Sequence, residues 1–379
     1  MKPRLFTPGP TPVPERILLR MAEAPLYHRS DEFRAVMRRV NAGLQYVFQT
    51  ARPVLTLGSS GTGAMESVVA SLFRPGDTVI TVNGGKFGAR WTQLAHAFGL
   101  KAEEIEIPWG RALMKEELAA SLKAHGEAAA VFLTHCETST GTLTDVAQMA
   151  RIIREHSRAL VCVDGISSVG ALEMQFDLWG IDVCVCASQK GFMVPPGLAF
   201  VALGERAESA ARDARAHGFY FDLLKALASW KTADTPWTPP VSLIAGLDAA
   251  LEMIREEGIE NVWRRHRRLG AALRSGMTGL DLRLFSQAPS DSMTAVWIPE
   301  GIPWRQFSDH LRKESGITVS GGQEEYARKI FRVAHMGYCD AGDIVEAVSG
   351  IERALSALGH RFPSGAGLEA TQRALAEES

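Results

Sequence analysis

Short strand-like runs and longer amphipathic stretches alternate from about Pro53 to Gly204. The runs predict strands at 53–57, 77–82, 101–107, 128–135, 159–164, 182–188 and 197–203. Between them, apolar positions recur at the helical period at 62–73, 88–99, 114–126 and 145–157. Alternating strands and helices indicate βαβ units, and near-continuous apolar strands are typical of a sheet covered on both faces. We therefore predict an α/β fold with a mostly parallel seven-stranded sheet.

The pattern changes after Gly204. Helical periods dominate, and a proline-rich stretch at 232–243 precedes helices predicted at 243–258 and 261–277. Shorter strands are expected at 294–300, 316–322 and 329–335, followed by a helix at 342–359. We predict a large domain at 1–259 and a smaller C-terminal α+β domain at 260–379. The tail from Arg361 is rich in Gly, Ser and Ala, so we expect it to be loosely ordered.

Composition and charge narrow the class of protein. Of 379 residues, 46% are hydrophobic and 22% charged, as in a globular protein, and the net charge of −2 comes from interleaved acidic and basic residues. This balance provides no footprint for nucleic acid or an anionic membrane. Residues 1–17 have no continuous apolar core, and no run has the length of a transmembrane helix, so we expect a cytoplasmic protein. The five cysteines show neither CxxC nor metal-ligand spacing, and we expect no metal site.

Ligands of open parallel sheets bind outside the carboxyl ends of the strands, and the loops there are unusual. After the first strand, "GSSGTGAME" fits an anion site or an ordinary glycine-rich helix start about equally well. After 77–82, Phe87 follows two glycines and fits either a cover for a flat ring or a packing residue. After 128–135, turn chemistry alone explains the polar residues of "CETSTGTL".

Two charged residues end apolar strands. Asp164 closes 159–164, where a carboxylate is costly unless it meets a partner, and Lys190 stands at the end of the next strand. The two residues either form a salt bridge or each engage a bound molecule. In the second case the carboxylate meets a protonated ring nitrogen and the amine a carbonyl carbon, because a buried lysine of lowered pKa is the usual Schiff-base nucleophile. A phosphate cradle, a ring cover, an anion and an amine at one edge together fit pyridoxal 5′-phosphate.

The chain resembles the class V branch of the fold type I pyridoxal-phosphate aminotransferases, in particular the serine–pyruvate and alanine–glyoxylate group. The resemblance extends over nearly the whole chain and rests on ordered motifs: "TPGPTPVP", "YHRSDEF", "YVFQT", "SSGTGAME", "FLTHCETSTG", "VDGISSVG", "GIDVCVCASQKG", "PPGLAFV", "FYFDLL", "WTPPVSL" and "KIFRVAHMGY". It implies pyridoxal 5′-phosphate as cofactor, small amino acids and 2-oxo acids as substrates, and a homodimer with active sites shared across the interface.

The resemblance also implies roles for single residues. Lys190 would hold the cofactor as a Schiff base and move the proton between substrate Cα and cofactor C4′. Asp164 would keep the pyridine nitrogen protonated, Phe87 would stack on the ring, and Ser139 would hydrogen-bond near the ring hydroxyl. The expected phosphate ligands are Ser60, Gly61, Thr62 and Gln189, with Thr238 reaching the phosphate of the partner subunit.

Substrate contacts and three departures complete the comparison. Arg332 would clamp the substrate α-carboxylate, a bidentate role suited to guanidinium, and the backbone of Gly9 would line the substrate pocket. Thr235 stands where relatives often carry tyrosine, so one phosphate contact is missing or replaced. His335 either shapes the pocket or packs beneath Arg332, the second being favoured. Cys136 replaces a common glycine, which we expect to be neutral.

We predict a transaminase that works by a ping-pong cycle, with serine or alanine as donor and glyoxylate or pyruvate as acceptor. Aspartate is an alternative donor, with His335 or Arg29 serving its side-chain carboxylate. A cysteine desulfurase or related lyase is disfavoured, because 315–332 offers no cysteine. A non-catalytic partner subunit is disfavoured by the intact Lys190, Asp164 and Arg332. A nucleotide-binding oxidoreductase is disfavoured because the dinucleotide glycine spacing is missing.

Overall fold

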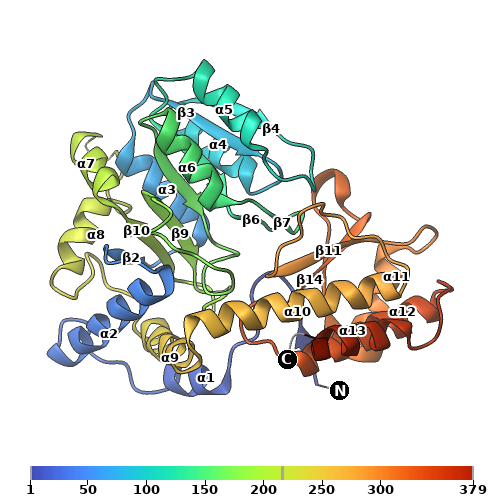
Figure 1. Ribbon diagram of the computed structural model, residues 1–379. Coiled ribbons are helices and arrows are strands. Elements are labelled where there is room, and N and C mark those ends of the chain that lie inside the picture. The colour runs from blue at the N-terminus through green and yellow to red at the C-terminus, as the bar shows by residue number, and fades with distance from the viewer. Residues whose placement is uncertain (1, 215–216, 378–379) are drawn as a thin grey trace.

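The computed structural model describes residues 2–214 and 217–377, and its centre is a seven-stranded sheet (Figure 1). The outer bounds of the two predicted domains, residues 1 and 379, lie outside the described residues. The strand order is β2-β10-β9-β8-β5-β3-β4, and only β10 runs antiparallel to its neighbours. The strands are β2 (Val54–Leu57), β3 (Thr78–Asn83), β4 (Lys101–Glu106), β5 (Ala130–Thr134), β8 (Leu160–Asp164), β9 (Val183–Ala187) and β10 (Ala199–Leu203). All seven predicted strands are confirmed.

Helices cover both faces of this sheet, and a separate apolar core lies under each layer. One layer holds α3 (Gly61–Leu72), α4 (Gly88–Ala97), α7 (Glu205–Ala214) and α8 (Leu223–Trp230). The other holds α2 (Asp31–Phe48), α5 (Lys115–Ala124), α6 (Val146–His156) and α9 (Val241–Glu257). Because both faces are buried, β5, β8, β9 and β10 contain no exposed residue, which explains their near-continuous apolar sequences.

The C-terminal part has its own core and a small antiparallel sheet of order β11-β14-β13. Its elements are α10 (Ile259–Gly279), β11 (Met293–Trp297), α11 (Trp304–Ser315), β12 (Ile317–Thr318), β13 (Ser320–Gly321), a 3₁₀ turn (Glu324–Tyr326), β14 (Ile330–Ala334), α12 (Ala341–Ala357) and α13 (Ala366–Glu377). The long helix α10 runs from beneath the large sheet to this part (Figure 1). The short β6 (Cys136–Glu137) and β7 (Thr142–Leu143) form a hairpin beside this C-terminal part.

The N-terminal segment packs on the C-terminal part before it enters the large sheet region. Strand β1 (Arg4–Leu5) pairs in parallel with β12, and the amide of Ala334 donates to the carbonyl oxygen of Phe6. Helix α1 (Glu15–Met21) then packs against α9. The chain between β1 and α1 therefore passes from one part of the molecule to the other, and it carries Gly9.

The tail prediction was wrong. Residues 366–377 form α13, which packs along α10 and buries Gly367, Thr371 and Leu375. A Cβ on Gly276 would lie 2.3 Å from Oγ1 of Thr371, so this glycine lets the two helices approach closely. The small residues of the tail thus allow close helix packing and do not make a loose segment.

Among the described residues, no helix is long and apolar enough to cross a membrane.

Candidate active site

The two charged residues that end apolar strands lie at the same edge of the sheet. Asp164 is the last residue of β8, Lys190 follows the end of β9, and these parallel strands pair with Asp164 opposite Val185. No ion pair of the described residues joins the two side chains. The simple salt bridge is therefore not formed, although the Asp164 charge acts on Lys190 and partly counters the effect of its burial.

The amine of Lys190 lies against the N-terminal segment. Its Nζ donates to the carbonyl oxygen of Pro8, and the hydroxyl of Thr11 donates to the Lys190 carbonyl oxygen at 3.0 Å. A Cβ on Gly9 would lie 2.8 Å from Cε and 2.9 Å from Nζ of Lys190, so another residue here would push the end of the lysine side chain aside. Burial lowers the pKa of Lys190 to about 8. A lysine with this pKa has an appreciable neutral fraction near pH 7, which a nucleophile or base requires.

Asp164 is buried and accepts a hydrogen bond at Oδ1 from the amide of Ile166, at 2.8 Å. The pKa of Asp164 is raised to about 7, mainly by burial and also by the charge of Glu137, while the bond from Ile166 acts in the opposite direction. A cationic group placed beside this carboxylate would restore its charge, because an opposite charge favours the ionised form. Such an environment suits the partner of a protonated ring nitrogen.

The predicted phosphate cradle begins helix α3. Ser60 is the N-cap, and its hydroxyl makes no capping bond, while Gly61 and Thr62 open the first turn. A Cβ on Gly61 would lie 2.4 Å from Cδ1 of Ile166, so the helix starts tightly against the segment after Asp164. Backbone N–H groups in a first helical turn are available to an anion.

Phe87 forms the N-cap of α4 and is half-buried. The guanidinium of Arg90 lies 5.0 Å from its ring centroid and donates to the Thr62 hydroxyl at 3.2 Å. Arg90 thus joins the predicted ring cover to the predicted phosphate cradle. Arg90 was not predicted as a site residue, although an arginine three residues after Phe87 on a helix is a visible signal.

Ser139 is held by a buried carboxylate that the sequence analysis also missed. Its hydroxyl donates to Oε1 of Glu137 at 2.5 Å and accepts from the amide of Lys86 at 3.0 Å. The hydroxyl proton is thereby committed to Glu137. The neighbouring hydroxyl of Thr138 pairs with that of Ser167 at 2.6 Å. A hydrogen bond between the ring hydroxyl and Ser139 remains a prediction. In that bond the ring hydroxyl would donate and the Ser139 oxygen would accept.

Arg332 lies in β14 and is buried, with two of its three nitrogens bound to carbonyl oxygens. Nε donates to Gly321 at 2.9 Å and Nη1 donates to Thr138 at 2.8 Å, and no hydrogen bond or ion pair of the described residues engages Nη2. Burial lowers the pKa of Arg332 to about 10, while the charge of Glu137 acts in the opposite direction. The guanidinium is therefore fixed in orientation, cationic and lacking a directly bound carboxylate.

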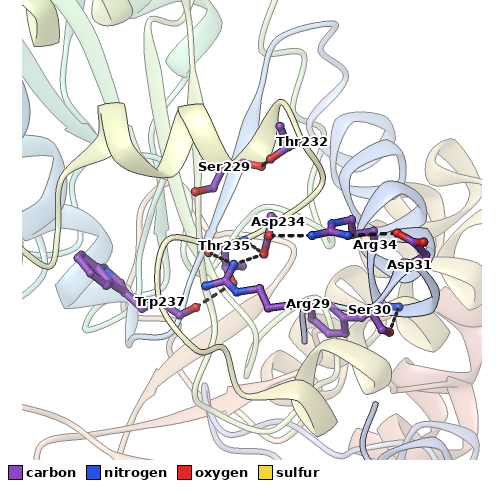
Figure 2. A network of polar contacts seen from close by, with 10 residues as sticks. Arg29, Ser30, Asp31, Arg34, Ser229, Thr232, Asp234, Thr235 and Trp237 are labelled. Carbon is purple, nitrogen blue, oxygen red and sulfur yellow. Dashed lines mark hydrogen bonds and ion pairs between the residues drawn. The ribbon is translucent and has the colours of Figure 1, made fainter. Parts of the chain in front are cut away.

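Thr238 is an exposed residue of the loop between α8 and α9, and it lines a small pocket together with Leu57 and Gly58. The loop is held by Asp234, which forms ion pairs with Arg29 and Arg34 and accepts a bond from the amide of Thr235 at 2.8 Å (Figure 2). The Thr235 hydroxyl donates to the Trp237 carbonyl oxygen at 2.8 Å, so Thr235 closes a turn. The role of Thr238 at a partner subunit is not tested in a single chain and stays a prediction.

His335 and Cys136 are the other two residues that depart from the family pattern, and both are buried. His335 pairs with the Thr294 hydroxyl at 3.1 Å, and burial together with the Arg274 charge lowers its pKa well below the ordinary value. A neutral, buried histidine fits a packing residue, and its position beneath Arg332 stays a prediction. Cys136 contacts the Ser292 hydroxyl at 3.3 Å through its sulfur, and burial raises its pKa to about 11.

Two features of the site show that its residues fit pyridoxal 5′-phosphate. The side-chain oxygen of Gln189, beside Lys190, is buried without a hydrogen-bond partner among the described residues. If this amide is turned by 180°, its N–H groups take the place of the oxygen and can donate to a phosphate. Glycine at position 9 also lets the backbone approach the amine closely, with a φ of 156° that other residues rarely adopt. Elsewhere, no cluster of three metal-ligating side chains occurs among the described residues.

Fold and site together define a pyridoxal-phosphate-dependent transaminase. A family model described as Aminotransferase class-V matches residues 5–337, and the chain belongs to this family. The predicted family, fold class, cofactor and enzyme class are confirmed.

Relatives within the family carry different names. A protein named soluble hydrogenase, small subunit, from Synechococcus sp. is 41% identical over 99% of this chain and 98% of its own length. An L-aspartate–glyoxylate aminotransferase from Paracoccus denitrificans is 34% identical over 97% and 95%. A serine–glyoxylate aminotransferase from Methylorubrum extorquens is 32% identical over 98% and 96%. Among solved structures, pyridoxamine–pyruvate aminotransferase from Mesorhizobium loti superposes with a TM-score of 0.94 at 26% identity, covering 100% of this chain and 98% of its own.

Proposed function

We propose that this transaminase moves the amino group of a small, uncharged amino acid, serine or alanine, to glyoxylate or pyruvate in a ping-pong cycle. The observation that carries the proposal is the state of Arg332. Its guanidinium is buried and oriented by two carbonyl oxygens, and Nη2 has no partner among the described residues. A charge-assisted bond to one α-carboxylate is the interaction this geometry favours.

Arg29 and His335 are the two side chains predicted as a second anchor, and Arg274 is a further basic group, whose charge acts on His335. Arg29 forms an ion pair with Asp234 and donates to the Thr235 carbonyl oxygen at 2.9 Å. Arg274 is paired with Asp291 at 2.9 Å. His335 is buried and held neutral. Arg29 and His335 are thus not free to meet a second carboxylate, which favours a donor with a single carboxylate over aspartate.

The residues of the chain divide the chemical work. When bound, pyridoxal phosphate supplies an electron sink for the electrons left on the substrate Cα. Arg332 would orient the substrate through its carboxylate, and Asp164 would hold a positive charge on the ring nitrogen. The amine of Lys190, with a pKa of about 8, would take the proton from Cα and return it at C4′. The Pro8 carbonyl oxygen supports this amine from the side of the N-terminal segment.

A half-reaction screen tests the donor. Single amino acids are mixed with the yellow, cofactor-loaded protein, and the loss of the yellow band is followed in the absence of acceptor. Serine and alanine should discharge the band faster than aspartate at equal concentration, and glyoxylate or pyruvate should restore it. Faster discharge by aspartate would contradict the proposed donor while leaving the transaminase class intact.

A second candidate function follows from the hydrogenase name of the Synechococcus relative. In that case the chain would be a partner subunit within a larger complex. The intact set of Lys190, Asp164 and Arg332 favours catalysis, since a purely structural role requires none of these charges at one edge. A protein that purifies alone and completes both half-reactions would support the transaminase proposal, whereas a cofactor-loaded protein inert toward every amino acid would support the partner-subunit alternative.

We also propose a homodimer in the cytoplasm. The dimer is supported by an aromatic cluster near Thr238, in which Phe219 and Tyr220 are 73% and 49% exposed and contact Trp237. Exposed clusters of this size favour contact with a partner. Sedimentation of the purified protein tests the dimer, and Thr238→Ala should weaken cofactor binding if the site is shared. The cytoplasmic location stays a prediction.

A further inference from the structure

We infer that Glu137 is a positioning residue that locks the ring cover, the Ser139 turn and the carboxylate clamp into one arrangement. This inference rests on the cofactor site of the proposed function and does not depend on the choice of donor. Glu137 lies in β6 and is 6% exposed. A carboxylate buried to this extent is costly unless both oxygens are satisfied.

Four donors converge on the Glu137 carboxylate from two separate segments. Oε2 accepts from the amides of Phe87 and Gly88, at 3.1 and 2.9 Å. Oε1 accepts from the amide and the hydroxyl of Ser139, at 2.9 and 2.5 Å. Three of these donors are backbone N–H groups, which donate hydrogen bonds and cannot accept one from a protonated carboxyl group. Burial raises the pKa of Glu137, and these hydrogen bonds act against that rise. The geometry suits a carboxylate that cross-links the start of α4 to the turn after β6.

The backbone of Gly85 lies close to the Glu137 side chain. A Cβ on Gly85 would lie 2.5 Å from Cγ and Cδ of Glu137 and 2.5 Å from Oγ of Ser139. The glycine before the ring cover thus lets the backbone lie directly on the carboxylate. Two glycines precede Phe87 in the sequence, and this close approach explains why one of them, Gly85, has no side chain.

Glu137 also reaches the substrate side of the site. Its next residue, Thr138, provides the carbonyl oxygen that binds Nη1 of Arg332. The turn that Glu137 fixes therefore determines where the guanidinium is held. Its negative charge raises the pKa of both Arg332 and Asp164, so the same carboxylate acts electrostatically on both sides of the site.

The test replaces Glu137 by Gln, which keeps the size and removes the charge. Because backbone N–H donors face both oxygens, the amide NH₂ must face at least one of them in either orientation. Loss of a hydrogen bond to a charged group costs a factor of roughly ten or more. We expect amide hydrogen exchange in residues 84–90 of the apoprotein to become at least about tenfold faster. We also expect a higher cofactor Kd and a weaker visible circular dichroism of the bound cofactor, which reports the fixed orientation of its ring.

Asp182→Asn is the matched control. Asp182 is also a buried carboxylate and accepts from the amide of Val161 at 2.8 Å, but it pairs with Arg154 and Arg206 at the opposite end of the strands. This variant should lower the melting temperature while leaving exchange in 84–90 and the cofactor signals unchanged. Glu137→Asp, which keeps the charge but shortens the side chain, provides the same readouts if the Gln variant does not fold.

Faster exchange confined to residues 84–90 and 137–140 in the Glu137 variants, together with the cofactor changes, would support the inference. Wild-type exchange and circular dichroism in these variants would overturn it. Equal acceleration of residues 84–90 in Asp182→Asn would overturn it as well, because the effect would then reflect general loss of stability. None of these readouts requires turnover, so a wrong donor assignment would leave them unaffected.

Discussion

Replacement of Arg332 by Ala should abolish most of the discrimination in favour of substrates with an α-carboxylate. The guanidinium is buried, and Nη2 is the part left for a ligand. Removing one partner of a buried, hydrogen-bonded charge pair costs about 2–5 kcal/mol. At 1.4 kcal/mol per factor of ten, we expect kcat/KM for alanine to fall roughly 30- to 4,000-fold. The loss should fall mainly on KM, since the carboxylate is bound in ground and transition states alike.

The assay compares alanine with ethylamine, which has the same chain without the carboxylate. Half-reaction rates are measured for both compounds with the wild-type protein and with Arg332→Ala. The variant should lose rate with alanine and retain its rate with ethylamine. The yellow band should persist, because no bond of Arg332 involves the predicted phosphate ligands.

Arg274→Ala serves as the matched control for this experiment. Arg274 is also partly buried and also donates to a carbonyl oxygen, that of Ser290 at 3.1 Å, but it is paired with Asp291. It should leave the alanine-to-ethylamine ratio unchanged. Equal loss for alanine and ethylamine in Arg332→Ala, or an unchanged KM for alanine, would refute the assignment of Arg332 as the clamp.

Three further predictions concern the cofactor and the fold. Asp164→Asn should keep the cofactor but lower kcat by roughly 10²-fold or more, because losing a charge-assisted bond of about 3 kcal/mol removes the charge on the ring nitrogen. Stopped-flow half-reactions measure this rate, and a wild-type rate would contradict the role of Asp164. Reconstitution of the apoprotein with pyridoxal phosphate requires the neutral amine of Lys190, so its rate should rise with pH and level off above about 8 rather than above the ordinary 10.5; a rate still rising at pH 10 would contradict the lowered pKa. Gly276→Val should lower stability by about 1–3 kcal/mol through overpacking against Thr371; calorimetry measures this, and an unchanged melting temperature would contradict the close packing of α10 and α13.

The strands and the chemistry at their ends could be predicted because both leave local signals. Each strand is a short run of a recognisable period, and a charge that ends an apolar run, as at Asp164 and Lys190, is conspicuous. The carboxyl ends of parallel strands meet at one edge, so residues distant in sequence could be placed together before their contacts were known.

Glu137 and the tail helix could not be predicted, because their roles depend on tertiary contacts. In sequence, Glu137 is one polar residue in a loop that turn chemistry explains, and nothing there shows that amides of residues 87 and 88 point at it. Likewise, Gly276 and Thr371 are small residues far apart in sequence, and their close approach appears only when α13 packs on α10. Composition alone therefore indicated a loose tail where the structure has a helix.

The most direct test of the central claim is to locate the residue that binds the cofactor. The purified protein, loaded with pyridoxal phosphate, is reduced with borohydride, digested and analysed by mass spectrometry. We predict a yellow protein whose colour is lost on reduction and a single modified peptide that carries the cofactor on Lys190. A colourless protein, or a cofactor fixed on another lysine, would contradict the account of this site.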